Sequence, residues 1–140
     1  MKVITVQSPK ERQDAYEVRK RVFVEEQHVP LELEIDEHEE EAAHFVLYDE
    51  GKPCGAGRFR TKDGLGKAER ICILPDYRKK GAGRLIMEAL ETHAKGQGLP
   101  GVKLDAQVHA IPFYEKLGYE IISDEFMDAG IPHKTMKKTF

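Results

Sequence analysis

The sequence lacks tryptophan, carries only two cysteines among its 140 residues, and contains no apolar run that approaches the length of a membrane span. Its first residues, MKVITVQSPKER, also lack the apolar core of a secretion signal. These absences predict a cytoplasmic protein with no membrane partner. They also predict that Cys54 and Cys72 are two free, buried thiols rather than a disulfide.

The sequence also has little net charge of either sign. Its 22 basic and 25 acidic residues leave a formal net charge of −3. So small a charge argues against binding of nucleic acid through bulk electrostatics. The chain has no internal repeat, low-complexity tract or long linker, and we expect a single domain over residues 1–140.

Apolar periodicity and turn signals predict seven strands and three helices. The expected strands are Val3–Val6, His44–Asp49, Cys54–Thr61, Ala68–Pro75, Val102–Gln107, Tyr119–Phe126 and His133–Thr139. The expected helices run from Pro9 to about Glu25, from the glycine turn to about Lys95, and from about Ala110 to Leu117. Runs of antiparallel strands beside βαβ units predict an α/β (α+β) fold with a mixed sheet and helices packed on its faces.

The turn between the fourth strand and the second helix has an unusual composition, with four cations around two glycines and no acid among them. Backbone N–H groups in the first turn of a helix lack intrahelical partners and attract anions, and glycines leave room for a bulky anion. The turn therefore predicts a binding site for a phosphate-bearing cofactor. Its residues are Arg78, Lys79, Lys80, Gly81, Ala82, Gly83 and Arg84.

Other interpretations of this turn fit less well. A Walker phosphate loop requires Gly-x-x-x-x-Gly-Lys followed by Ser or Thr, which the sequence does not contain. A dinucleotide fingerprint requires a third glycine at position 86, where the chain has Ile86. A turn whose glycines serve only close packing stays open as an alternative, although it leaves the cations unexplained.

The stretch R-K-K-G-A-G resembles the Arg/Gln-x-x-Gly-x-Gly/Ala signature of the GNAT N-acetyltransferases. A second stretch, AQVHAIPFYEKLGYE, is similar to the second motif of that family, a strand followed by a helix that carries a tyrosine. The stretches RKRVFVEEQHVP and DAGIPHKTM further resemble the ElaA-like branch, and the likeness extends over nearly the whole chain. The resemblance implies the GNAT acyl-CoA N-acyltransferase fold, with a mostly antiparallel central sheet and helices on both faces.

The resemblance also implies a mechanism, in which an amine attacks the thioester of acetyl-CoA directly and no metal takes part. It places the pantetheine arm along the backbone of Ile71, Cys72 and Ile73, with the Ile73 N–H as a candidate oxyanion donor. Tyr114 matches the tyrosine of the family and is expected both to contact the cofactor and to protonate the leaving thiolate. Gln107 is a candidate cofactor contact at a position where many members have asparagine.

For the general base, Glu69 is the leading candidate, because alternation along the strand would place it on the face shared with Ile71 and Ile73. A carboxylate that begins an otherwise apolar strand is expected to have a raised pKa and to relay a proton through water. The weaker alternatives are two histidines, His44 and His133.

Residues 25–41 contain nine acidic residues and neither lysine nor arginine. Such a run is usually a solvated face, but in the family this region closes over the acceptor site. In that case the acids would favour a cationic acceptor, whereas Arg58 and Arg60 on the next strand would favour an anionic one. The acids expected to face the acceptor are Glu34, Asp36 and Glu37.

The function expected from these observations is acetyl-CoA-dependent acetylation of a primary amine on a small molecule. Three alternatives stay open: a non-catalytic acyl-CoA-binding or sensing module, a protein-modifying acetyltransferase, and an interaction protein that uses its acidic run. A homodimer is compatible with the sequence and not required by it. His38 and His44 lack the tight spacing of metal ligands, and His109 is expected to be a capping or surface residue.

Overall fold

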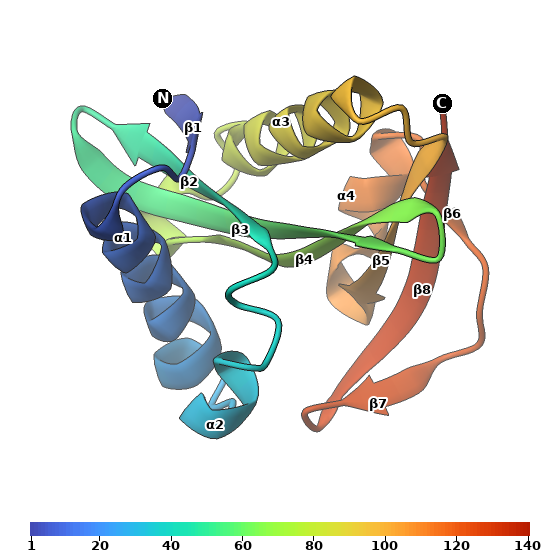
Figure 1. Ribbon diagram of the computed structural model, residues 1–140. Helices are drawn as coiled ribbons and strands as arrows, with labels where there is room; N and C mark the ends of the chain where they lie inside the picture. The colour runs from blue at the N-terminus through green and yellow to red at the C-terminus, as the bar shows by residue number, and fades with distance from the viewer.

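One continuous sheet organises the computed structural model, which describes residues 1–140 (Figure 1). The strands follow the order β1-β2-β3-β4-β5-β8-β6, and β7 also pairs with β8. Only β4 and β5 are parallel neighbours, so the predicted mixed, mostly antiparallel sheet is confirmed. The strands are β1 (Lys2–Thr5), β2 (Ala43–Asp49), β3 (Lys52–Lys62), β4 (Leu65–Ile73), β5 (Gly101–Gln107), β6 (Glu120–Ile121), β7 (Phe126–Asp128) and β8 (Ile131–Thr139).

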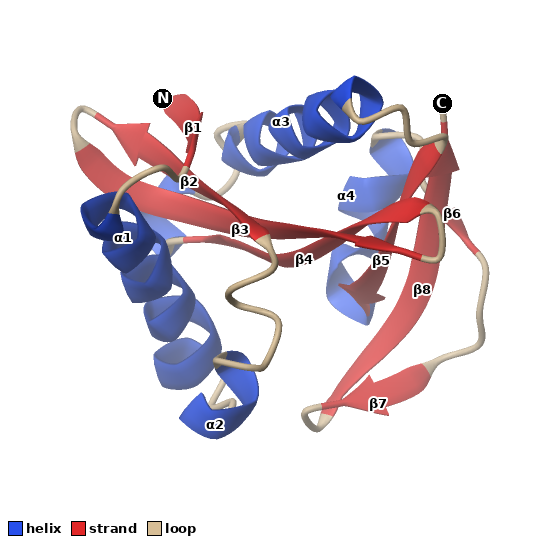
Figure 2. Cartoon of the chain, viewed as in Figure 1, coloured by secondary structure: helices blue, strands red, loops and turns tan.

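Helices cover both faces of this sheet, as Figure 2 shows. On one face α1 is continued by the π-helix η1 and followed by the short α2; on the other lie α3 and α4. Their bounds are α1 (Pro9–Arg19), η1 (Lys20–Glu26), α2 (Leu31–Glu34), α3 (Ala82–Gly96) and α4 (Ile111–Lys116), with the 3-10 turns η2 (Pro75–Tyr77) and η3 (Val108–Ala110). No helix of the structure is long and apolar enough to cross a membrane.

The local signals in the sequence explain where most of these elements begin and end. Ser8 Oγ accepts a hydrogen bond from the Glu11 N–H at 3.2 Å and caps α1, with Pro9 in the first turn. Two differences stand out. The first helix changes to π-helical geometry at Lys20, and the expected strand Tyr119–Phe126 divides into β6 and β7.

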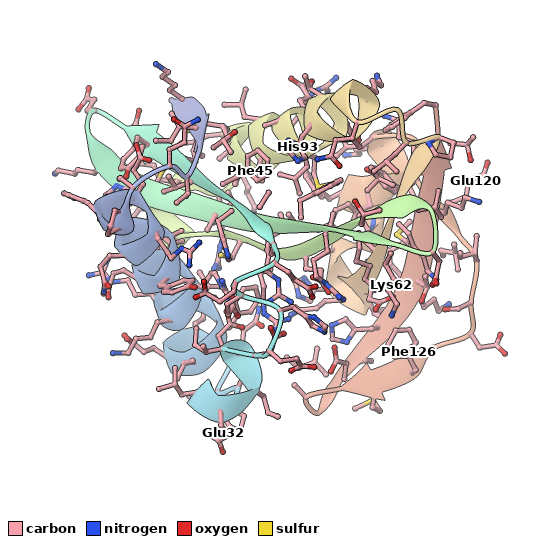
Figure 3. The ribbon with its side chains drawn as sticks, viewed as in Figure 1. Glu32, Phe45, Lys62, His93, Glu120 and Phe126 are labelled. Carbon is pink, nitrogen blue, oxygen red and sulfur yellow. The ribbon has the colours of Figure 1, made fainter.

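The sheet separates two hydrophobic clusters, which fix its two layers of helices. The larger cluster fills the space between the sheet and α3 with α4, where Phe45 and His93 meet with ring centroids 5.6 Å apart (Figure 3). The smaller one packs α1 against the sheet through Val18, Val46 and Cys72. Both cysteines are free and buried, as predicted.

The feature that positions the site is a fork between β4 and β5. These parallel strands are paired only where Gly66–Ala68 faces Val102–Leu104. Beyond Ala68 they separate toward their C-terminal ends, and that gap opens beside the start of α3. The sheet therefore holds unpaired backbone at its centre, a location where ligands can bind to it.

Candidate active site

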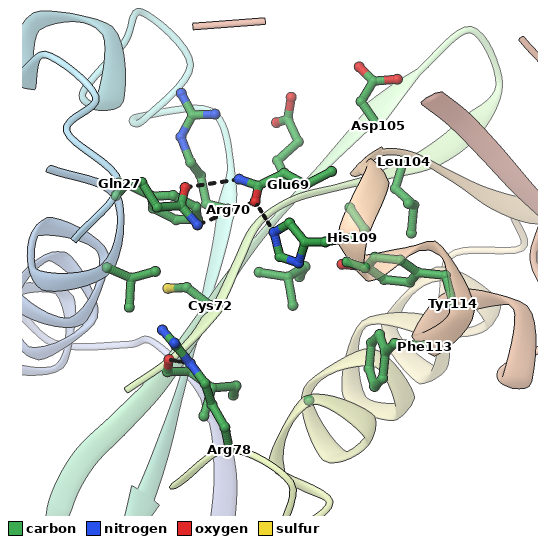
Figure 4. Close-up of a pocket in the computed structure, with 18 of the residues that line it drawn as sticks. Gln27, Glu69, Arg70, Cys72, Arg78, Leu104, Asp105, His109, Phe113 and Tyr114 are labelled. Atoms are coloured by element: carbon green, nitrogen blue, oxygen red, sulfur yellow. Dashed lines mark hydrogen bonds between the residues drawn. The ribbon is translucent and has the colours of Figure 1, made fainter. Parts of the chain in front are cut away.

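A cavity of about 840 Å³ occupies the fork (Figure 4). Its walls come from η1, from β4 and β5, from the starts of α3 and α4, and from the β7–β8 hairpin. Of the candidate cofactor residues and the leading catalytic candidates, all line this cavity except Lys80 and Arg84. Segments far apart in the sequence thus meet in one hollow.

The turn at residues 78–84 forms one end of the cavity. Glycine is favoured at its positions 81 and 83 for two different physical reasons. Gly81 caps α3 with a φ of 80°, in the left-handed region that side chains rarely adopt, and a Cβ there would meet no atom within 4 Å. A Cβ at Gly83 would lie 2.9 Å from Phe113, so Gly83 allows α3 and α4 to pack closely. The space beside the helix start is therefore open, as a bound phosphate would require.

Carboxylates from elsewhere in the fold neutralise part of the positive charge of this turn, which the sequence does not indicate. Arg78 donates two hydrogen bonds to Glu26, of 2.8 and 2.6 Å, and these bonds, with a smaller effect of its charge, lower the pKa of that carboxyl. Arg84 pairs with Glu88 on the outside of α3 at 2.9 Å. No acid lies among the four cations in sequence, but in the structure Glu26 from η1 and Glu88 from α3 pair with two of them. Among the lysines and arginines that line the cavity, Lys79 is the one without an ionic partner.

The open edge of β4 forms the middle of the cavity. The Leu74 N–H donates to the Cys54 carbonyl on β3 at 2.9 Å. Since successive amides of a strand point to opposite sides, the Ile73 N–H points away from β3 and toward the fork. On the same side the Ile73 carbonyl accepts a hydrogen bond from Arg78 Nε at 2.9 Å. The Ile73 amide is thus directed as an oxyanion donor must be.

Glu69 lies on a different face of the sheet from the one expected. Between the pairs Arg58–Glu69 and Ala56–Cys72 the register shifts, and Arg70 adopts a φ of 56°. This β-bulge adds one residue and reverses the alternation. Ile71 therefore packs toward α3, whereas Glu69 bonds to Arg58 on the opposite face.

The pKa of Glu69 is lowered, and the expected increase is wrong. Burial alone would raise this pKa, but a hydrogen bond from Arg60 and the positive charges of Arg58 and Arg60 outweigh it. Arg60 Nε lies 2.8 Å from Glu69 Oε1, and Arg58 Nη2 lies 3.0 Å from the same atom. Glu69 is consequently ionised at neutral pH and a weak base.

Three of the nine acidic residues of the segment, Glu34, Asp36 and Glu39, belong to an ion-pair cluster, whereas the other six are exposed, as in a solvated face. Arg19, only 1% exposed, binds Glu34 at 2.7 Å and Glu39 at 2.8 Å. Asp36 binds Arg58 at 2.7 Å, and the same guanidinium reaches Glu39 at 3.0 Å. Hydrogen bonds to Arg58 and to a backbone N–H outweigh the effect of burial and hold the pKa of Asp36 at about 2.

We name these groups the arginine–carboxylate cluster. It comprises Arg19, Arg58, Arg60, Arg70, Glu34, Asp36, Glu39 and Glu69. Four guanidinium groups face four carboxylates, so their formal charges cancel. None of Glu34, Asp36 and Glu37 lines the cavity, and the expectation that they face the acceptor is wrong.

Tyr114 enters the fork from α4, on the side of the sheet opposite the arginine–carboxylate cluster (Figure 4). The residue is 8% exposed, and burial, with a smaller contribution from Cys72, raises the pKa of its phenol. Its hydroxyl has no hydrogen-bond partner in the protein and is not closed off from the cavity. A protonated, unpartnered donor therefore points into the site.

A bridge across the cavity was not expected from the sequence. Gln107 at the end of β5 donates to Gln27 Oε1 at 2.9 Å, and Gln27 donates back at 3.3 Å (Figure 4). His109 Nε2 lies 2.6 Å from Gln107 Oε1, and this histidine is exposed, as expected, but also lines the cavity. Nothing in the sequence around Gln27 signals this contact, because 80 positions separate the two glutamines.

The other histidines lie in contrasting places. His44 is 3% exposed, bonds through Nε2 to the Glu39 carbonyl at 2.8 Å, and does not line the cavity. Burial lowers the pKa of His44, which keeps it neutral. His38 contacts Glu41 and Arg60 outside the cavity. His133 lines the cavity from β8.

Comparison with known proteins agrees with this geometry. The family described as the acetyltransferase (GNAT) domain matches residues 5–140. The uncharacterized N-acetyltransferase YjcF of Bacillus subtilis is 52% identical over 139 residues, which cover 99% of both chains.

Solved structures show the same fold. ElaA of Escherichia coli aligns with a TM-score of 0.86 at 21% identity and covers 99% of both chains. An aminoglycoside 6′-N-acetyltransferase in complex with coenzyme A aligns with a TM-score of 0.78 at 18% identity, over 99% of this chain and 97% of that one. With the family match and the similarity to YjcF, these findings confirm the resemblance seen in the sequence: the chain belongs to the GNAT acetyltransferase family and is an acyltransferase.

Proposed function

We propose that this enzyme transfers the acetyl group of acetyl-CoA to a primary amine of a small molecule. The observation that carries the proposal is the convergence of three groups in one cavity: the open start of α3, the outward amide of Ile73 and the unpartnered hydroxyl of Tyr114. The coenzyme A bound in the aminoglycoside acetyltransferase of the same fold supports the choice of cofactor.

The turn at the start of α3 would hold the phosphates of acetyl-CoA. Its free backbone N–H groups and the positive end of the helix dipole favour a pyrophosphate, and Lys79 adds a charge that no carboxylate neutralises. The pantetheine arm would then pair with the open edge of β4 at Ile71, Cys72 and Ile73. Acetyl-CoA supplies an activated thioester, and the chain supplies the groups that orient it.

Two groups would act on the reacting atoms. The Ile73 N–H is directed to stabilise the oxyanion that forms when an amine attacks the carbonyl. Tyr114 would donate its proton to the sulfur, because its phenol is protonated at neutral pH and its hydroxyl has no competing acceptor in the protein. Glu69 also lines the cavity, but its oxygens are held by Arg58 and Arg60.

The region that covers the sheet supports a small acceptor. Arg70 on β4 donates to the carbonyls of Leu33 and Glu34 at 3.1 and 3.3 Å and so fixes α2 above the strand. The cavity's volume of about 840 Å³ lies in the range of pockets that bind small molecules, which supports a small acceptor.

The first test is the effect of acetyl-CoA on the melting temperature of the protein. A ligand at 100 times its Kd stabilises the native state by about 2.7 kcal/mol. Gly81→Asp should abolish the stabilisation, because it places a negative charge where the phosphates would bind. Gly81→Asn is the matched control, since asparagine has the same shape and tolerates a positive φ, and it should retain most of the stabilisation.

The second test is thiol release from acetyl-CoA with ethanolamine, putrescine, lysine, glucosamine and kanamycin as acceptors. Release with one of these amines supports the proposed reaction. Stabilisation by acetyl-CoA without release from any amine would favour the acyl-CoA-binding module. Equal stabilisation of the wild type and Gly81→Asp would place the cofactor elsewhere.

A further inference from the structure

We propose that His133 is the catalytic base, which takes a proton from the ammonium group of the acceptor through its Nε2 atom. The inference rests on the proposed function, and it adds the residue that prepares the amine for attack. It also identifies the acceptor chemically as an amine that arrives protonated.

The hydrogen bonding of His133 determines which of its nitrogens carries the proton. His133 Nδ1 lies 2.7 Å from the Ile131 carbonyl oxygen. A carbonyl oxygen only accepts hydrogen bonds, so Nδ1 must donate, and in the neutral ring Nε2 keeps its lone pair. Nε2 has no partner in the protein and is not sealed from solvent, while the residue lines the cavity. The basic atom is thus available to a ligand.

The neighbours of His133 hold its ring in place. On β8 the residue pairs with Gln107 of β5 on one side and with Phe126 of β7 on the other. Its ring stacks on Phe126 with centroids 5.9 Å apart and an angle of 21° between the planes. His133 is 8% exposed, so the imidazole is both fixed and reachable from the cavity. A proton acceptor that is already oriented loses little entropy when its substrate binds.

The charges that face this part of the cavity favour a cationic ligand. The charged and histidine residues that line the cavity from β4, β5, η3 and β7 are Lys67, Glu69, Arg70, Asp105, His109 and Asp128. Arg70 is paired with Glu34 and Asp36 of the arginine–carboxylate cluster. Lys67 and Asp105 neutralise each other at 3.0 Å, and Glu69 is held by two arginines. Asp128 has no ionic partner and is the carboxylate left to attract an ammonium group.

Other candidate bases are less suited to the task. Glu69 has a lowered pKa, and its oxygens are occupied by Arg58 and Arg60. His109 is exposed and is held by the side chain of Gln107 rather than by backbone. His44 lies outside the cavity. His133 alone combines a fixed tautomer, a buried ring and a free lone pair in the cavity.

The proposed step balances protons and electrons. Nε2 takes one proton from the ammonium, and the neutral amine attacks the thioester carbonyl. The C–N bond forms and the C–S bond breaks, and the thiolate takes the proton of Tyr114. The second proton lost by nitrogen passes to solvent, His133 releases its proton there, and Tyr114 regains one. Ammonium and acetyl-CoA thus become amide, free CoA and one proton.

The kinetic test compares His133→Asn with the wild type from pH 6 to 9.5, using acetyl-CoA and the most reactive of the five amines named above. The asparagine amide can still donate to Ile131, but it is not basic. We expect kcat/KM at pH 7 to fall by at least about 100-fold, with the deficit shrinking as pH rises and more amine is deprotonated. Acetyl-CoA affinity should stay within about twofold.

The competing histidine provides the comparison that could overturn the inference. If His109→Asn loses activity at low pH in this way while His133→Asn keeps the wild-type pH profile, the base is His109. A uniform loss in His133→Asn at every pH would assign His133 a purely structural role and also contradict the proposal.

A second measurement needs no acceptor. ¹⁵N NMR of the histidine side chains, with the His133 signals assigned by their loss in His133→Asn, reports which ring nitrogen is protonated in the neutral form. We expect a proton on Nδ1 and none on Nε2, and a change in the Nε2 signal when acetyl-CoA binds. A proton on Nε2 would overturn the inference. Failure of the proposed function would instead be seen in the wild type, as no stabilisation by acetyl-CoA.

Discussion

Two segments of this chain each carry charge of only one sign in the sequence, but in the folded protein their charges are used differently. The acidic segment 25–41 has nine acids without a base, and the basic turn 78–84 has four cations without an acid. In the structure the central acids of the first segment are buried and paired with arginines from α1, β3 and β4. The basic turn lies at the mouth of a cavity, and Lys79 there has no ionic partner.

The comparison shows that the sign of a charged segment does not give the sign of the surface that it forms. Arg19 and Glu34 are 15 positions apart, and Arg58 and Asp36 are 22 apart, so their pairing depends on the tertiary fold. Glu32, in contrast, points outward from α2 and fits the expectation of a solvated face (Figure 3). The central acids of the segment thus have a structural role, whereas the basic turn keeps charge available for a ligand.

The largest effect is expected for a variant that breaks the arginine–carboxylate cluster. Arg19→Met should lower the free energy of unfolding by about 3–5 kcal/mol, because Glu34 and Glu39 would stay buried after each loses one of its two arginine partners. The measurement is urea denaturation at pH 7. Arg84→Met is the matched control in the basic turn: its ion pair with Glu88 is exposed, and the change should be within about 0.5 kcal/mol. Similar losses in both variants would erase the contrast between the two segments.

The next effect concerns catalysis and should leave stability nearly unchanged. Tyr114→Phe keeps the ring that packs against Phe113 but removes the proposed proton donor. We expect kcat to fall about 10- to 1000-fold with an acceptor amine, while the Kd for acetyl-CoA stays the same. Steady-state kinetics and ligand-induced stabilisation separate these two quantities. Full activity would show that the hydroxyl is only a packed polar group.

Much of the fold could be predicted from local sequence signals. The hairpin turn at Glu50 and Gly51, the capping residues of α1 and the glycine turn before α3 each act within a few residues, and the structure has them in place. The bulge at Arg70 could not be predicted, because nothing in the strand pattern marks an extra residue. That one residue moved Glu69 to the other face of the sheet.

The candidate site was predictable to a similar degree. The strand β4 and the turn at residues 78–84, which we propose to hold the cofactor, lie close together in the sequence. One sequence motif therefore identifies both. The contacts of Glu26 with Arg78 and of Gln27 with Gln107 join segments 52 and 80 positions apart. The free lone pair of His133 depends on its bond to the Ile131 carbonyl, which only the geometry of the hairpin reveals.

A smaller effect should appear when acid titrates the cluster. The pKa of Asp36 is lowered from 3.8 to about 2 in the folded protein, so the unfolded chain binds its proton more readily. This carboxylate therefore contributes stability above about pH 4 that is lost as the pH falls toward 2. Unfolding free energies between pH 5 and 2.5 should fall less steeply in Asp36→Asn than in the wild type. Parallel curves would show that Asp36 does not belong to the cluster in solution.

The smallest effect tests the other side of the comparison, the charge left free in the basic turn. Lys79 lines the cavity without an ionic partner, whereas Arg84 lies outside it and is paired with Glu88. Lys79→Gln should raise the Kd for acetyl-CoA by about two- to fivefold at low salt, since an exposed ion pair contributes about 0.2–1 kcal/mol. Arg84→Gln should change it by less, and added salt should reduce the difference between the variants. Equal losses in both variants would mean that the phosphates respond to the total charge of the turn, and the distinction drawn between its paired and unpaired cations would then be wrong.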